Sequence, residues 1–262
     1  MARRIVVTSG KGGVGKTTVT ANIGYALAQC KKKVLLCDLD FGLNNLDIVT
    51  GVENKIVYDI CDVLSGTCRL RQALIQDQKK STLYVLPSGN AAYNTDISGQ
   101  SVKLLFENVS NYFDYVLIDC PAGIDVGFHR AVSCADEAIV VVTPNLSSIR
   151  DANKAISILD GYKLKSVGIV INRARGDLMM DQKMLFPEDI SKILNVDLLG
   201  VIPEEDIVFL SSGGYLPKFC DAYKSYKLIA ENLMKGKSKV FDATKKYSGF
   251  LGSIRRRIKS DI

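Results

Sequence analysis

Short apolar runs alternate with longer amphipathic segments along most of the chain. The runs are rich in Val, Ile and Leu and cover residues 3–9, 32–40, 82–89, 114–123, 137–144, 166–174 and 197–204. Uninterrupted apolar runs of this length are typical of strands that helices bury on both faces. Helices are expected between them, at about 16–29, 58–75, 99–111, 126–135, 147–160, 187–194 and 221–235. This alternation predicts an α/β fold with a doubly wound, mostly parallel sheet.

The same pattern sets the expected domain boundaries. No repeat, proline-rich linker or low-complexity block interrupts residues 1–236, so we expect them to form one domain. After the sequence NLMKGKSK the apolar periodicity stops. We therefore expect residues 237–246 to be a flexible polar linker and residues 247–262 to be a separate C-terminal segment.

A glycine-rich loop follows the first predicted strand and leads into the first predicted helix. Residues 10–17 read GKGGVGKT and match the P-loop pattern G-x-x-x-x-G-K-[ST]. Glycines let the backbone wrap a triphosphate closely, and the start of the helix adds its positive end. Lys16 is expected to reach the β- and γ-phosphates, and the Thr17 hydroxyl to bind Mg²⁺. The residues expected to contact the nucleotide are Gly12, Gly13, Val14, Gly15, Lys16, Thr17 and Thr18.

Acidic side chains end two further predicted strands. Asp38 and Asp40 end the second apolar run, and Asp119 ends the fourth. Ligands of parallel α/β sheets bind at the carboxyl ends of the strands, so these carboxylates are expected near the P-loop. Each alone is equally compatible with a polar cap where a buried strand reaches the surface. Three of them beside a P-loop favour a catalytic magnesium site with ATP and Mg²⁺ as ligands.

The P-loop has a second lysine, and it carries a family resemblance. The sequence KGGVGKTT resembles the deviant Walker A box of the ATPase family that contains MinD, ParA and nitrogenase iron protein. The resemblance implies an ATP-dependent sandwich dimer in which Lys11 crosses to the partner's phosphates and stabilises the departing γ-phosphate. It also implies that Asp119 holds Mg²⁺ through water, that Asp40 orients the attacking water, and that Asp38 supports the metal.

The base-binding side of the site carries a weaker signal. No N-K-x-D guanine motif occurs in the chain, which favours ATP over GTP. Asn172 and Pro203 each end a predicted strand and match adenine-flanking positions of the family. A strand-end turn without nucleotide contact explains these two residues equally well.

Longer stretches resemble the MinD branch of this family over essentially the whole chain. They include DFGLNNLDIVTG from Asp40 and ADEAIVVVTPNLSSIRDANK from Ala135, with Asn44 where an arginine is expected. The resemblance implies a slow, partner-stimulated, Mg²⁺-dependent ATPase that recruits a MinC-like septum inhibitor. A MinE-like protein or a polar scaffold would act on it. Ser148 and Asp151 match the partner-binding helix, although a solvated helix face accounts for them nearly as well.

The basic charge of the chain is concentrated at its C-terminus. Residues 235–262 carry nine Lys or Arg and two Asp, more net positive charge than the +6 of the whole chain. The remaining residues are therefore close to neutral, which disfavours DNA as a partner. No apolar run approaches the roughly 20 residues of a membrane-spanning helix.

At about 100° per residue, the large apolar side chains of residues 247–262 fall on one stripe with arginines beside it. This pattern predicts an amphipathic helix that binds anionic membrane lipids at the interface, disordered until it binds because of its glycines. A helix docked on the domain is the alternative. The stripe also includes Tyr247, and the residues expected to contact lipid are Phe250, Leu251, Ile254, Arg255, Arg257 and Ile258.

Together these features predict an ATPase on the inner face of the cell membrane that positions the division septum. The seven scattered cysteines, without a C-x-x-C pair, favour the reducing cytoplasm. Three alternatives stay open: a flagellar-placement ATPase of the same family, a ParA-like DNA-partitioning ATPase, and an adaptor that binds ATP without turnover.

Overall fold

A single eight-stranded sheet organises the chain. The computed structural model describes residues 1–41, 44–89, 98–211 and 215–260, and the strand order is β3-β4-β2-β5-β1-β6-β7-β8. The strands are β1 (Arg3–Thr8), β2 (Val34–Asp38), β3 (Ile75–Gln76), β4 (Leu83–Leu86), β5 (Tyr115–Asp119), β6 (Glu137–Val142), β7 (Ser166–Ala174) and β8 (Asp197–Pro203). All pairs are parallel except β3 with β4.

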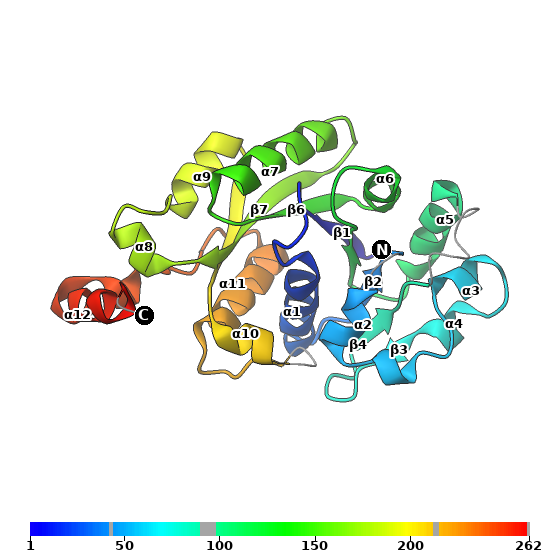
Figure 1. The fold of residues 1–262 in the computed structure, drawn as a ribbon. Helices are drawn as coiled ribbons and strands as arrows, with labels where there is room; N and C mark the ends of the chain where they lie inside the picture. Colours follow the sequence, from blue (N-terminus) through cyan, green and yellow to red (C-terminus); the bar gives the residue numbers. More distant parts are fainter. Residues whose placement is uncertain (42–43, 90–97, 212–214, 261–262) are drawn as a thin grey trace.

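Helices cover both faces of the sheet, as Figure 1 shows. One face carries α5 (Gly99–Val109), α6 (Val126–Ser133), α7 (Leu146–Leu159) and α9 (Pro187–Leu194), and the other carries α1 (Lys16–Gln29), α2 (Asn45–Thr50) and α11 (Asp221–Lys235). Successive strand residues supply opposite cores, so that Leu35 belongs to the first and Leu36 to the second. The predicted doubly wound, mostly parallel α/β fold is confirmed.

The segment predicted as one helix over 58–75 is built differently. It forms two short helices, α3 (Ile60–Leu64) and α4 (Leu70–Ala73), and then the antiparallel edge strand β3. The Asp59 carboxylate caps α3 by accepting N–H groups of Cys61 and Asp62. Gly66, with φ 78, follows the end of α3 in a left-handed conformation that a continuous helix cannot contain. The short helices α8 (Gly176–Met180) and α10 (Asp206–Leu210) also lie outside the predicted elements.

The chain packs against the domain up to Tyr247, beyond the predicted boundary at residue 236. Ala243 and Tyr247 are 5% and 6% exposed, and the Lys246 ammonium lies 3.3 Å from the Asp221 carboxylate. The Tyr247 ring therefore belongs to the interior of the domain and not to the exposed stripe in which the sequence places it. A 3₁₀ turn (Lys245–Tyr247) then leads to α12 (Gly249–Ser260), which lies near the end of α8 (Figure 1). In the part of the chain that the structure describes, no helix is both long and apolar enough to cross a membrane.

Candidate nucleotide-binding site

The P-loop connects the central strand β1 to α1 at the carboxyl edge of the sheet. Gly13 and Gly15 have φ values of 77° and 92°, in the region that glycine adopts without steric cost. The helix α1 begins directly at Lys16, so its free N–H groups and positive end face the loop. Loop and helix start together form a concave set of backbone donors suited to a polyphosphate.

Contacts from two neighbouring elements hold the P-loop in this shape. A Cβ placed on Gly10 would lie 2.0 Å from the backbone oxygen of Asp151, so the loop touches the backbone of α7. From the other side, the buried Asn172 donates its side-chain amide to the backbone oxygen of Val14 at 2.8 Å. The loop is thus fixed by its protein neighbours on both sides.

The two P-loop lysines occupy different environments. Lys16, in the first turn of α1, is only 8% exposed. The Lys11 ammonium instead donates to the Ser147 hydroxyl in the first turn of α7 at 2.9 Å, in an exposed contact. Lys16 therefore belongs to the phosphate cradle, whereas Lys11 stands at its outer rim.

The register of the sheet places two buried carboxylates next to each other. Asp38 at the end of β2 pairs with Asp119 at the end of β5, and both are 1% exposed. Burial raises the pKa of the Asp38 carboxyl, and the charge of the neighbouring Asp119 raises it further. Burial also raises the pKa of Asp119, although hydrogen bonds from Thr17 and Thr20 and the charge of Lys16 oppose this effect. A cation placed here would relieve the repulsion between two ionised carboxylates.

The first of these carboxylates also shapes the loop that follows it. The two Asp38 oxygens accept the backbone N–H groups of Asp40 at 2.8 Å and Leu46 at 3.3 Å. These bonds hold the half-exposed Asp40 at the rim of the site. Asp40 is the residue that is expected to orient the attacking water. Asn44, directly before α2, has φ 41° and accepts a hydrogen bond from the Ser88 hydroxyl. Asparagine tolerates this left-handed conformation, which gives a local reason for its presence at this position.

The side-chain oxygen atoms beside the P-loop are suitable ligands for magnesium. Mg²⁺ prefers oxygen ligands and is held by one or two carboxylates together with water and phosphate. Thr17, Asp38 and Asp119 provide such oxygens beside the P-loop. Among the described residues, no three His, Cys, Asp or Glu side chains converge to hold a metal by themselves. A magnesium ion here would therefore also depend on water and the nucleotide phosphates.

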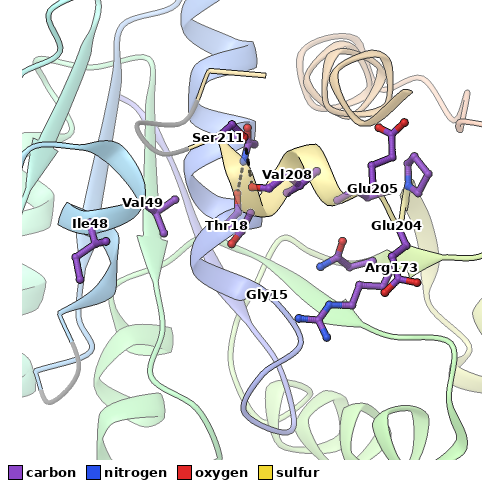
Figure 2. Close-up of a pocket in the computed structure, with 13 residues that line it drawn as sticks. Gly15, Thr18, Ile48, Val49, Arg173, Glu204, Glu205, Val208 and Ser211 are labelled. Atoms are coloured by element: carbon purple, nitrogen blue, oxygen red, sulfur yellow. Dashed lines mark hydrogen bonds between the residues drawn. The ribbon is translucent and has the colours of Figure 1, made fainter. Parts of the chain in front are cut away.

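A pocket of about 300 Å³ opens beside the start of α1. Gly15 and Thr18 line it from the P-loop side, and Asn172 and Pro203 line it from the ends of β7 and β8. In Figure 2 it lies between α2, which contributes Ile48 and Val49, and the segment with Glu204, Glu205 and Val208. The structure thus brings the two predicted base-flanking residues together within reach of the P-loop. The size and mixed lining of this pocket suit a nucleoside.

Several residues of the site lie outside the sequence prediction. Thr20 donates to Asp119 at 3.1 Å, one helical turn after the P-loop lysine. Arg173 adopts φ 58°, and this turn of the backbone lets it line the same pocket as its neighbour Asn172. The Glu205 carboxylate accepts N–H groups from the first turn of α11 while it lines the pocket. The sequence could have pointed to Thr20, because it is a polar residue one helical turn after the P-loop lysine. No sequence feature pointed to Arg173 or Glu205 as part of the site.

The predicted partner-binding residues differ in accessibility. Ser148 is 2% exposed, and its hydroxyl accepts the backbone N–H of Thr143 at 3.0 Å. Its side chain is therefore an internal contact at the start of α7 and is not available on the helix surface. Asp151 is half-buried, lies 3.7 Å from the Lys154 ammonium, and lends its backbone to the contact with Gly10. Of the two, only Asp151 presents its side chain near the surface.

The predicted lipid-contacting residues lie on α12. Phe250, Leu251 and Ile254 are 82%, 70% and 43% exposed, and Arg255 is also exposed. Arg257 and Ile258 belong to the helix, but their side chains lie outside what the structure describes. The side chains of Phe250, Leu251 and Ile254 thus face away from the domain core.

Comparisons with known proteins find relatives over nearly the whole chain. The family model of the AAA domain matches residues 2–166. The septum site-determining protein MinD of Synechocystis sp. is 40% identical, with 98% of this chain and 99% of the relative covered. Among solved structures, the MinC:MinD cell division protein complex of Aquifex aeolicus has a TM-score of 0.84 and 43% identity over 91% of this chain and 97% of that one. The septum site-determining protein MinD of Pyrococcus horikoshii, complexed with Mg-ADP, has a TM-score of 0.80 and 30% identity over 90% and 97% of the two chains.

Proposed function

Because the chain belongs to the MinD family of septum site-determining P-loop ATPases, we propose that it is an ATP-switched membrane protein of cell division. It hydrolyses ATP with Mg²⁺ in a sandwich dimer. In the ATP-bound dimer it attaches to an anionic membrane through α12 and recruits a MinC-like inhibitor. Hydrolysis, stimulated by a MinE-like protein or a polar scaffold, releases it.

The separation of the two P-loop lysines is the observation that carries this proposal. Lys16 is buried in the cradle, whereas the Lys11 ammonium is directed toward Ser147 at the exposed rim. A lysine in this position is free to leave its serine partner and reach the phosphates of a second protomer. Positive charge delivered in this way stabilises the departing γ-phosphate, as an arginine finger does.

The remaining residues supply the hydrolytic chemistry. Lys16 and the P-loop N–H groups hold the β- and γ-phosphates, and Asp40 orients a water molecule for attack on the γ-phosphorus. When bound, Mg²⁺ neutralises charge that develops on the phosphate oxygens. Thr17 and Asp119 would hold it, supported by the hydrogen bond between them that the structure contains, while Asp38 would support the site by accepting the backbone N–H of Asp40.

The pocket beside α1 is proposed to receive the adenosine part of ATP. Pro203 contributes an apolar surface for the base, and Asn172 contributes a side-chain amide. Since Asn172 also holds Val14, one residue links base recognition to the shape of the phosphate loop.

Membrane attachment is proposed to use the exposed apolar side chains of α12 together with the basic residues near them. A single short helix of this kind is a weak anchor, because ordering and immobilisation offset much of its burial free energy. Two such helices on a dimer make the second contact intramolecular and raise avidity by about 10²–10⁴. Dimerisation by ATP would therefore control attachment.

The recruited partner is proposed to dock on α7 beside Asp151. The relative from Aquifex aeolicus is a MinC:MinD complex, which supports a MinC-like partner for this chain. The half-buried Asp151 side chain belongs to the residue whose backbone packs on Gly10 of the P-loop. A partner on this surface would therefore be close to the nucleotide.

Vesicle sedimentation with ADP, ATP and a nonhydrolysable ATP analogue tests the proposal. The full-length protein is expected to sediment with phosphatidylglycerol-containing vesicles in ATP or the analogue but not in ADP. A chain that ends at Lys246 and the Lys16→Ala variant are both expected to stay in the supernatant. Equal sedimentation of Lys16→Ala and the unmodified protein would contradict the switch. ATP-dependent retention on DNA that survives removal of residues 247–262 would instead support the DNA-partitioning alternative.

A further inference from the structure

The helix α12 has two opposite faces with different partners. Phe250, Leu251 and Ile254 are exposed, whereas Gly252 is buried and Arg256 is only 23% exposed. At about 100° per residue, the centre of the exposed apolar group lies about 170° from the centre of the buried pair. The side of the helix that contacts the domain is therefore opposite to Phe250, Leu251 and Ile254.

The buried face is held by specific contacts. The Arg256 guanidinium lies 3.2 Å from the carboxylate of Asp181, just after α8, and it also donates to the backbone oxygen of Tyr247 at 2.8 Å. Gly252 packs so closely on Tyr247 that an added Cβ would lie 2.2 Å from its carbonyl carbon. Only glycine permits this approach, so α12 rests against a fixed point of the domain.

That point is itself rigidly placed. Tyr247 is 6% exposed and packs on Gly176 at the start of α8, where an added Cβ would lie 3.0 Å from the tyrosine ring. Gly176 also touches the backbone oxygen of Ala243. Ala243 and Tyr247 are therefore embedded in the domain, and Tyr247 lies only two residues before the start of α12.

We infer that α12 contacts an anionic lipid surface while it stays docked on the domain through Gly252 and Arg256. Residues 245–260 carry six basic side chains and no acidic one, so the complementary surface is negatively charged. Phe250, Leu251 and Ile254 already face outward and need no undocking to reach lipid. This inference rests on the proposed function and deepens it, because the domain then has a fixed orientation on the membrane.

A docked helix and a free tail respond in opposite ways to two substitutions. Asp181→Asn removes an acidic side chain, so a free basic tail should bind anionic vesicles equally well or better. Gly252→Ala improves helix propensity, which for a free tail should strengthen binding by about fivefold. If α12 binds while docked, both changes loosen a preorganised helix and weaken binding, by about three- to fivefold for Asp181→Asn and more for Gly252→Ala.

The experiment measures binding of the full chain to vesicles of equal parts phosphatidylglycerol and phosphatidylcholine, with the nonhydrolysable ATP analogue present. Asp189→Asn is the matched control, because it removes an exposed carboxylate that lies 3.6 Å from the Lys192 ammonium on the same helix, α9. It is expected to bind as the unmodified protein does. Weaker binding of Asp181→Asn and Gly252→Ala supports docked binding, and equal or stronger binding of both overturns it.

A fluorescent reporter checks the docking without lipid. The chain has no tryptophan, so Phe250→Trp provides a single probe on the exposed face of α12. Its anisotropy is expected to be that of the whole domain and to fall when Asp181→Asn is added. Low anisotropy before that change would overturn the inference. Failure of the unmodified protein to bind vesicles would instead contradict the proposed function, so the two outcomes are distinguishable.

Discussion

The side-chain amide of Asn172 donates a hydrogen bond to the backbone oxygen of Val14 at 2.8 Å, across 158 positions of sequence. It ties the end of β7 to the phosphate loop at a buried point. The contact also explains why position 15 is glycine, since an added Cβ there would lie 2.6 Å from the Asn172 amide nitrogen. The shape of the P-loop thus depends on a strand two places away in the sheet.

Asn172→Ala is expected to weaken both folding and nucleotide binding. The substitution leaves the Val14 carbonyl without its buried partner, which should lower the free energy of unfolding by about 1–3 kcal/mol and ADP affinity by about tenfold. Urea unfolding and titration with a fluorescent ADP analogue measure the two effects. Asn153→Ala, on the exposed surface of α7, is the control. Loss of ADP affinity with unchanged stability would mean that Asn172 acts on the base alone.

Gly10→Ala is expected to destabilise the domain by about 3 kcal/mol or more. The new Cβ would lie 2.0 Å from the Asp151 backbone oxygen, and α7 cannot move without disturbing its buried face. Gly12→Ala is the matched control from the same loop, since its Cβ would meet only the Ala122 side chain at 3.7 Å. Similar thermal stabilities of the two variants would show that the contact with α7 is not required.

Mixed dimers test whether Lys11 acts on the partner's nucleotide. Lys11→Ala and Asp40→Ala are each expected to lose at least about 100-fold in ATP turnover while they still bind ADP. When the two variants are mixed, each heterodimer contains one complete site. The Lys11→Ala chain supplies Asp40 to that site, and the Asp40→Ala chain supplies Lys11. Phosphate release should then recover to about a quarter of the unmodified rate, because half of the dimers carry one complete site. No recovery on mixing would place Lys11 in its own site.

The ion pair between Arg4 and Asp136 predicts a pH-dependent contribution to stability. The Arg4 guanidinium, 2.9 Å and 3.1 Å from the carboxylate oxygens, lowers the pKa of Asp136. Because the pKa of Asp136 is lower in the folded state than in the unfolded state, the ion pair stabilises the fold at pH values above the unfolded-state pKa of about 3.9. This stabilisation is lost as the pH falls through the folded-state pKa. Asp136→Asn should therefore cost about 1–2 kcal/mol at pH 7 and progressively less below about pH 4. Urea unfolding of both proteins across pH 3–8 measures the difference, and a constant difference would contradict the assignment.

The P-loop and its helix were predictable because their signals are local. The positive φ values of Gly13 and Gly15 follow from the spacing of the motif, and α1 begins and ends at the predicted residues 16–29. The apposition of Asp38 and Asp119 followed from strand order, since parallel strands end at one edge. The bond between Asn172 and Val14 was not predictable, because it depends on the register of distant strands and on the turn at Arg173.

The C-terminal segment shows where periodicity fails. Counting 100° per residue places Tyr247 on the apolar stripe, but this count assumes an unbroken helix. Gly249, the first residue of α12, has φ 70°, so the helical geometry does not continue back to Tyr247, which is buried in the domain. Likewise, the pattern over 58–75 has a helical period, but Gly66 divides it into two short helices.

The contact between Gly10 and α7 has a consequence for regulation. Gly10 of the P-loop packs directly on the backbone of Asp151 in α7. Thermodynamic linkage requires that any influence across this backbone act equally in both directions. If ATP strengthens the attachment of a protein bound to α7, that protein strengthens the binding of ATP by the same factor. The affinity of this ATPase for ATP would therefore depend on whether a protein is bound to α7.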